Sequence, residues 1–219
     1  MQDLHDALTD TGRAALNQAA ALSGLGGIGK TQTAVEYAYR YFYDTPIYEW
    51  VFWVKADTEL ALVTDLAELA RSLDLGDGTL EELAARSLRW LETNHRWLLI
   101  FDNADEPETV KPWLPRNPQG RVLLTSRAPR FTSLGVKNPI AVTKFSLEES
   151  IAFLRDRTNL PALDAAELAA ITALAQELDG LPLALEQAAA YIAQMGVSFA
   201  VYWHYYQQRL VLLEKGGVA

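Results

Sequence analysis

A glycine-rich segment that ends in lysine and threonine is the feature that most constrains this chain. Residues 24–31 read GLGGIGKT, which fits the G-x-x-x-x-G-K-[ST] pattern of a phosphate-binding loop. The small apolar run at residues 19–22 predicts a buried strand before it, and Val35, Ala38 and Phe42 predict one apolar face of a helix after it. A flexible glycine turn before an ordinary helix is the alternative, but such a turn needs neither Lys30 nor Thr31.

Each residue type in this loop has a physical role in holding phosphate. The glycines allow backbone conformations that are closed to other residues and bring amide N–H groups close to an anion. A helix that begins near Lys30 directs its unsatisfied amides and its positive dipole end to the same place. The Lys30 ammonium can reach the β- and γ-phosphates, and the Thr31 hydroxyl can bind Mg²⁺. We therefore predict nucleotide contacts from Gly24, Gly26, Gly27, Ile28, Gly29, Lys30, Thr31 and Gln32.

Composition excludes several other classes of protein. The chain has 219 residues, a net charge of −9, half of its residues hydrophobic and no cysteine. The acidic balance argues against nucleic acid as a main partner, since phosphate neutralisation needs a basic face. The absence of cysteine excludes disulfides and thiolate chemistry. The acidic, polar N-terminus is unlike a signal peptide, and no apolar run approaches the ~20 residues of a membrane span. With a nucleotide site, this composition favours the cytoplasm.

Strands and helices alternate up to Lys144, and only helices are expected afterwards. The alternation predicts an α/β domain with a parallel sheet covered by helices, over residues 1–144, and an all-helical domain over residues 145–219. The proline-rich segment 106–119 is expected to be mostly loop. Besides the strand at residues 19–22, the sequence predicts strands at residues 48–56, 97–101, 121–125 and 139–142.

Helix starts are indicated by capping signals. Asp57 is expected to cap the helix that follows the second strand. Thr79 with Glu82, and Ser146 with Glu149, fit the capping box, in which the first residue and the fourth satisfy each other's backbone N–H groups.

Two residues at predicted strand ends complete a candidate catalytic set with Lys30. Asp102 follows the continuous apolar run WLLIF, where an open sheet places its ligands, and it can organise a metal with Thr31. Arg127 follows RVLLT and Ser126 and is the candidate sensor of a γ-phosphate. The alternative for Asp102 is a simple cap of the turn after the strand. The alternative for Arg127 is a solvated arginine in a loop. Asn103 stands where many hydrolytic P-loop enzymes keep a second acid, and asparagine cannot accept a proton from water, so we predict slow or negligible turnover.

These motifs together resemble the NB-ARC type of signal-transducing ATPases with numerous domains, the STAND class. This class includes plant disease-resistance proteins, the apoptosome scaffold and many bacterial and fungal relatives. The phosphate loop, the metal-acid strand ending at Asp102, Thr125-Ser126-Arg127 and the GLPL segment at residues 180–183 match the family in its order. The resemblance implies strand order 5-1-4-3-2, binding of ATP or ADP with Mg²⁺, and a contact from Pro182 to the nucleotide. It also implies exchange of ADP for ATP that opens the domains and permits oligomerisation and effector signalling, with slow turnover.

The chain also departs from the family pattern. The upstream hydrophobic-hydrophobic-Gly-Arg-Glu segment that contacts adenine is missing, as are the winged-helix, effector and sensor domains, so we expect a nucleotide-binding core from a longer protein.

Two other functions stay open. One is a phosphotransferase acting on a small-molecule acceptor, although no arginine-rich lid is visible. The other is a nucleotide-insensitive interaction platform that uses the aromatic segment at residues 199–206.

Overall fold

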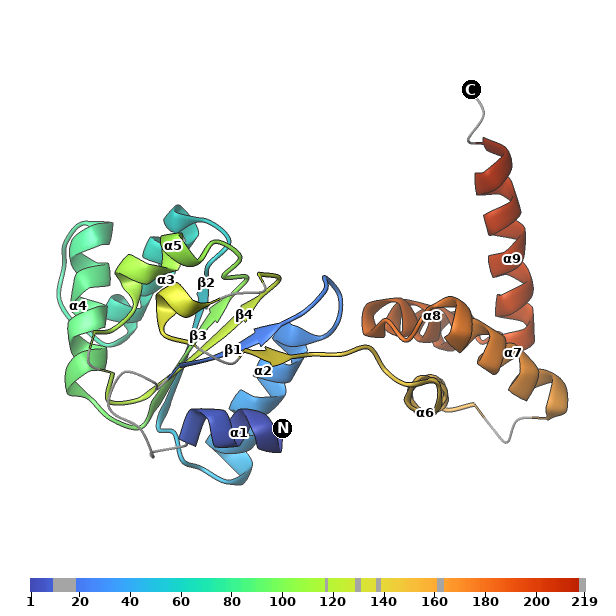
Figure 1. The fold of residues 1–219 in the computed structure, drawn as a ribbon, viewed down its shortest axis with the longest axis horizontal. Coiled ribbons are helices and arrows are strands. Elements are labelled where there is room, and N and C mark those ends of the chain that lie inside the picture. Colours follow the sequence, from blue (N-terminus) through green and yellow to red (C-terminus); the bar gives the residue numbers. More distant parts are fainter. Residues whose placement is uncertain (10–18, 117, 129–130, 137–138, 161–163, 217–219) are drawn as a thin grey trace. The chain divides into compact units, whose positions relative to one another are not determined.

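The structure, a computed structural model, describes residues 1–9, 19–116, 118–128, 131–136, 139–160 and 164–216. It divides into two units, Met1–Val142 and Thr143–Ala219 (Figure 1). The division falls close to the domain boundary expected at residues 144/145. None of the helices in the described ranges is both long and apolar enough to cross a membrane.

The first unit is a five-stranded parallel sheet with helices on both faces. The strands lie in the order β2-β3-β4-β1-β5, and each neighbouring pair is parallel. This order confirms the predicted 5-1-4-3-2 arrangement. The strands are β1 Ala19–Ser23, β2 Trp50–Lys55, β3 Trp97–Asp102, β4 Arg121–Ser126 and β5 Ile140–Ala141. The helices are α1 Gln2–Thr9, α2 Lys30–Tyr39, α3 Glu59–Ser72, α4 Leu80–Thr93 and α5 Pro107–Val110, with shorter turns η1 Arg40–Asp44, η2 Lys111–Trp113 and η3 Thr132–Leu134.

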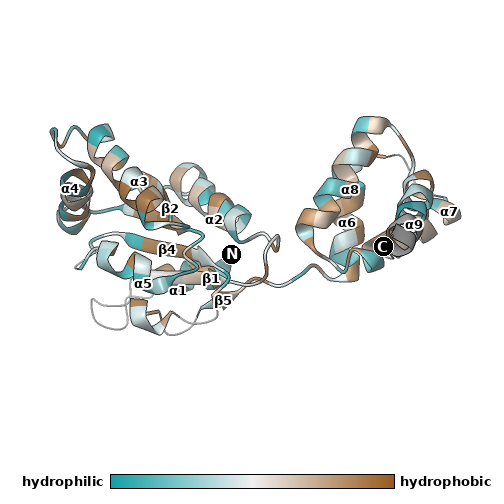
Figure 2. Ribbon diagram, turned by 90° about the horizontal axis from the view of Figure 1, so that it is seen from above, coloured by the Kyte–Doolittle hydropathy of each residue, from teal (hydrophilic) through white to brown (hydrophobic). Residues whose placement is uncertain are grey.

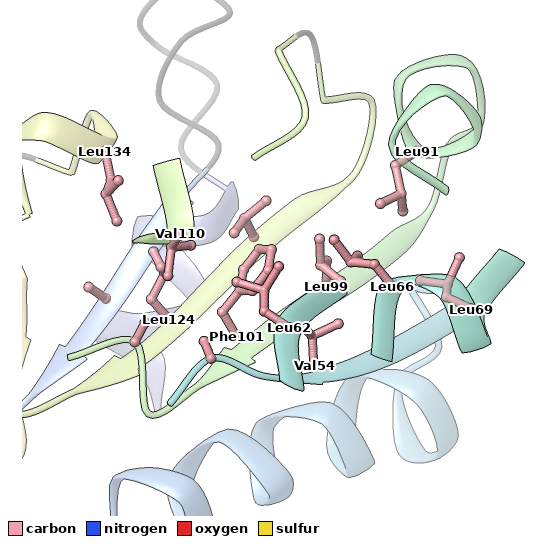
Figure 3. Packing of buried hydrophobic residues seen from close by; sticks show 14 of the residues in the cluster. Val54, Leu62, Leu66, Leu69, Leu91, Leu99, Phe101, Val110, Leu124 and Leu134 are labelled. Atoms are coloured by element: carbon pink, nitrogen blue, oxygen red, sulfur yellow. The ribbon is translucent and has the colours of Figure 1, made fainter. Parts of the chain in front are cut away.

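Alternate residues of the central strands point to opposite faces of the sheet and build two separate cores. Leu99 and Phe101 of β3 pack with α3, α4 and α5, and Figure 3 shows Leu62 and Leu66 of α3 beside them. The intervening Ile100, with residues of β1 and β4, packs with α1 and α2. Burial on both faces explains why β3 reads as one continuous apolar run. In Figure 2 the helices carry both hydrophobic and hydrophilic residues, as expected for helices with one buried side.

The apolar face expected for α2 is partly wrong. Val35 is 42% exposed, whereas Ala34 and Tyr37 are fully buried. Tyr37 takes this position because its hydroxyl reaches the Tyr48 hydroxyl at 3.1 Å, so its polar end is paired inside the core. The π-helical turn η1 then continues the helix to Asp44.

Two further local expectations are corrected. The N-cap of α3 is Thr58 rather than Asp57: its hydroxyl accepts the Ala61 N–H at 3.2 Å. Segment 106–119 is not mostly loop, because it contains α5 and η2. Pro107 lies in the first turn of α5, where a missing N–H costs nothing. The capping boxes at Thr79 and at Ser146 are both present, as predicted.

The second unit consists of helices in the described residues: α6 Leu147–Thr158, α7 Ala165–Glu177, α8 Pro182–Met195 and α9 Phe199–Gly216. Its core includes Leu154, Ile171, Leu185 and the fully buried Phe199. Gly180 has a φ of +63°, and a Cβ there would overlap the carbonyl oxygen of Phe145. The glycine of the GLPL segment is therefore needed for the close approach of two backbone segments.

Candidate functional site

The glycine loop between β1 and α2 has the backbone geometry that its sequence predicts (Figure 1). Gly29 forms the N-cap of α2 with φ +96° and ψ 15°, a left-handed conformation that other residues rarely adopt. Gly24 has φ +148°, and a Cβ there would lie 2.8 Å from the carbonyl oxygen of Val142. The loop is thus built around positions that only glycine fills without strain.

The N-terminus of α2 presents amide donors toward the loop. The first intrahelical bond runs from the Thr33 N–H to the Gly29 carbonyl, 2.8 Å. The amides of Gly29, Lys30, Thr31 and Gln32 precede that bond, and Gly29 has no side chain to cap them. Free amides together with the positive end of the helix dipole favour an anion such as a phosphate group.

Lys30 is held inside the loop. Its Nζ donates to the carbonyl oxygens of Gly24 and Leu25 at 2.9 and 2.8 Å, and the residue is only 8% exposed. An ammonium group has three donors, so one more bond can go to a ligand. Burial lowers the pKa of Lys30, the charge of Asp105 opposes that shift, Arg127 adds to it and Asp102 opposes it.

Thr31 and Asp102 meet although 71 residues separate them. The Thr31 hydroxyl donates to Asp102 Oδ1 at 2.9 Å. The hydroxyl of Thr125, which is fully buried on β4, donates to the same carboxylate oxygen and accepts the Asn103 N–H at 3.1 Å. Thr125 therefore fixes both the acid and the backbone that follows it.

The oxygens of Thr31 and Asp102 suit Mg²⁺, which proteins often hold through one or two carboxylates together with substrate phosphates. A metal at this point would be held by these two residues. It would neutralise charge that develops on phosphate oxygens during transfer.

Arg127 follows β4 and is bound to Asp105. Its Nε and its backbone N–H each lie 2.6 Å from a carboxylate oxygen of Asp105, and the Ser126 hydroxyl donates to that carboxylate at 3.0 Å. Partial burial acts to raise the pKa of Asp105, but the hydrogen bonds from Arg127 and Ser126 outweigh it, so the pKa lies below its usual value. The charges of Asp105 and Arg127 both reach Lys30.

The structure thus brings together the loop, Lys30, Thr31 and Asp102, with Arg127 nearby and held by Asp105. The roles of Thr125 and Asp105 were not predicted. Adjacent strand ends could have indicated them, because β3 and β4 are neighbours and polar residues follow both. Pro182 lies in the second unit as the first residue of α8, and its contact with a nucleotide stays a prediction.

Solved structures with low sequence identity share the fold. The Cdc6p structure from Pyrobaculum aerophilum matches with a TM-score of 0.60 and 16% identity, over 90% of this chain and 62% of that chain. A Walker-type ATPase from Pyrococcus abyssi matches with a TM-score of 0.60 and 14% identity, over 98% of this chain and 73% of that chain.

Sequence comparison finds relatives that are much longer. A nucleotide-binding leucine-rich repeat (NLR)-like protein from Hyaloscypha variabilis is 26% identical, covering 87% of this chain and 21% of the relative. The regulatory protein AfsR of Streptomyces griseus is 30% identical, covering 79% of this chain and 18% of the relative. The chain spans about a fifth of the length of these relatives.

The family model of the NB-ARC domain matches residues 1–160, which include the glycine loop at residues 24–31, strand β3 with Asp102 at its end and strand β4, which ends before Arg127. This range is more than half of the chain. The chain belongs to the NB-ARC family, within the STAND class of P-loop ATPases.

Proposed function

We propose that this chain is the ADP- and ATP-binding core of a regulatory switch, with slow ATP hydrolysis at most. The observation that carries the proposal is the contact between Thr31 and Asp102, 2.9 Å, beside the uncapped N-terminus of α2. A phosphate group at that helix end would face Lys30, and Mg²⁺ could bind beside it through the two contacting side chains.

Two observations support slow turnover. Asn103 occupies the place of the second acid, and its backbone is held in a left-handed conformation by the bond to Thr125. Asp105, the nearest other carboxylate along the chain, is occupied by donors from Arg127 and Ser126. A carboxylate with a lowered pKa is a poor base for water.

The regulatory role rests on the family and on the names of the relatives. One relative is named as a regulatory protein and another as an NLR-like protein, and both are more than four times as long as the chain. We propose that exchange of ADP for ATP opens the domains and permits self-association of the whole protein. Effector and sensor domains would then act in cis, in the cytoplasm, without nucleic acid as a ligand of this core.

The identity of the bound nucleotide and its turnover test this proposal. Purified protein is denatured, and the released nucleotide is identified by chromatography; ADP is expected, and a guanine nucleotide would refute the adenine assignment. Hydrolysis of excess Mg-ATP should proceed far below the roughly 1–100 s⁻¹ of kinases. Release of ADP that depends on an added small-molecule acceptor, well above plain hydrolysis, would support a phosphotransferase instead.

A further inference from the structure

The carboxylate of Asp105 is anchored more firmly than a surface ion pair requires. Its Oδ1 accepts the Arg127 backbone N–H at 2.6 Å and the Ser126 hydroxyl at 3.0 Å. Ser126 is the last residue of β4 and is buried, and Arg127 follows it directly. Its Oδ2 accepts the Arg127 Nε at 2.6 Å. The acid is therefore fixed by the strand end and in turn holds the side chain of Arg127.

The bond leaves most of the guanidinium available. Within the described residues, the Arg127 side chain donates one hydrogen bond, from Nε. The Arg127 side chain is 71% exposed, whereas the Asp105 side chain is 23% exposed. An arginine has five N–H donors in a rigid plane, so fixing Nε fixes the direction of the four N–H groups on the two Nη atoms.

The pair lies at the same end of the sheet as the phosphate loop, because Ser126, which precedes Arg127, pairs with Ser23, the last residue of β1 before the loop. An arginine that must bind a phosphate oxygen from a free rotamer loses side-chain entropy on binding, and an arginine that is already fixed loses less.

We propose that Asp105 is a positioning residue that orients Arg127 for the terminal phosphate and so sets the preference for ATP over ADP. This inference rests on the proposed nucleotide switch. It assigns Asp105 to holding Arg127 rather than to activating water. It also differs from competition, in which Asp105 would withdraw Arg127 from the phosphate, because Nε is the one guanidinium nitrogen that donates to Asp105 in the described residues.

Asp105→Asn tests the inference with little change in shape. The carboxylate accepts hydrogen bonds from three donors. The amide that replaces it has one oxygen and one NH2 group, and the NH2 group must face a donor from which it cannot accept. Titration calorimetry measures the Kd of Mg-ADP and of the non-hydrolysable analogue Mg-AMPPNP for the parent, Asp105→Asn, Arg127→Ala and the double variant. We expect Asp105→Asn to weaken AMPPNP about three- to tenfold and ADP less than about twofold. The double variant should bind AMPPNP no more weakly than Arg127→Ala alone, because the two substitutions remove the same interaction.

Glu49→Gln is the matched control, because Glu49 forms a half-exposed ion pair with Arg96 at 2.7 Å, away from the loop. It should leave both Kd values unchanged. Ser126→Ala removes one anchor of Asp105 and should shift AMPPNP in the same direction as Asp105→Asn; it keeps the test open if Asp105→Asn does not fold.

Tighter AMPPNP binding by Asp105→Asn would show competition and overturn the inference. Unchanged AMPPNP binding by Asp105→Asn, with loss in Arg127→Ala, would overturn the positioning role and leave the sensor role of Arg127 intact. An unchanged AMPPNP-to-ADP ratio in Arg127→Ala would remove the sensor role itself, and the inference with it.

Discussion

Thr125→Val removes the hydroxyl that connects the ends of β3 and β4. Valine has nearly the same shape as threonine, so packing against the fully buried neighbours changes little. The variant loses the bond from the hydroxyl to Asp102 and leaves the Asn103 N–H without its 3.1 Å acceptor. The expected effect is therefore almost purely one of hydrogen bonding.

The two losses set the size of the effect. A hydrogen bond to a charged group contributes about 1.5–3 kcal/mol, and an unsatisfied buried N–H costs about 1–3 kcal/mol. Asp102 keeps the bond from Thr31, and Asn103 is exposed enough for water to reach it, so both terms belong near their lower ends. We expect the free energy of unfolding of the first unit to fall by about 2–4 kcal/mol.

Urea denaturation followed by tryptophan fluorescence measures this change. Five of the six tryptophans lie in residues 1–142, and Trp97 is fully buried, so the signal reports mainly on the first unit. Thr93→Val is the matched control: its exposed hydroxyl bonds to helix carbonyls of Arg89 and Trp90, and its loss should cost under about 0.5 kcal/mol. A loss below about 0.5 kcal/mol for Thr125→Val as well would refute the role of Thr125.

Three further predictions concern stability. Gly180→Ala should destabilise the helical unit by about 1–3 kcal/mol, seen by circular dichroism melting, because a Cβ overlaps the Phe145 carbonyl; an unchanged melting temperature would contradict the close approach. Gly29→Ala should cost about 1–2 kcal/mol through its positive φ alone, since no atom lies within 4 Å of the new Cβ; an unchanged unfolding free energy in urea would show that the loop relaxes. The pKa of Asp105 is lowered from its ordinary value of 3.8. The free energy of unfolding that Asp105 adds relative to Asp105→Asn should therefore be fully present above pH 3.8 and disappear as the pH falls through the lowered pKa of the folded protein. A pH-independent difference between the two proteins would exclude that linkage.

Local patterns in the sequence predict the elements whose causes are local. The glycine loop, the capping boxes at Thr79 and at Ser146 and the continuous apolar strand before Asp102 depend on residues within a few positions of one another. The sequence predicts the N-cap of α3 one residue too early, at Asp57 rather than Thr58, because both residue types cap helices and only the backbone conformation separates them.

The sequence indicates less about contacts made across the sheet. Strand order places the ends of β3 and β4 side by side, and only then do Thr125 and Asp105 gain partners more than 20 residues away. The sequence predicts the wrong buried face for α2 for a similar reason: Tyr37 is buried because Tyr48, outside the helix, pairs with its hydroxyl. Periodicity alone does not show such a partner.

The affinity of the parent chain and of Lys30→Ala for Mg-ADP, measured side by side by titration calorimetry, tests the central claim most directly. Removing a charged donor that faces phosphate costs about 1.5–3 kcal/mol, so the account predicts at least about tenfold weaker binding. Equal affinity of the two proteins for Mg-ADP would contradict it, because the loop at residues 24–31 would then not be the phosphate site.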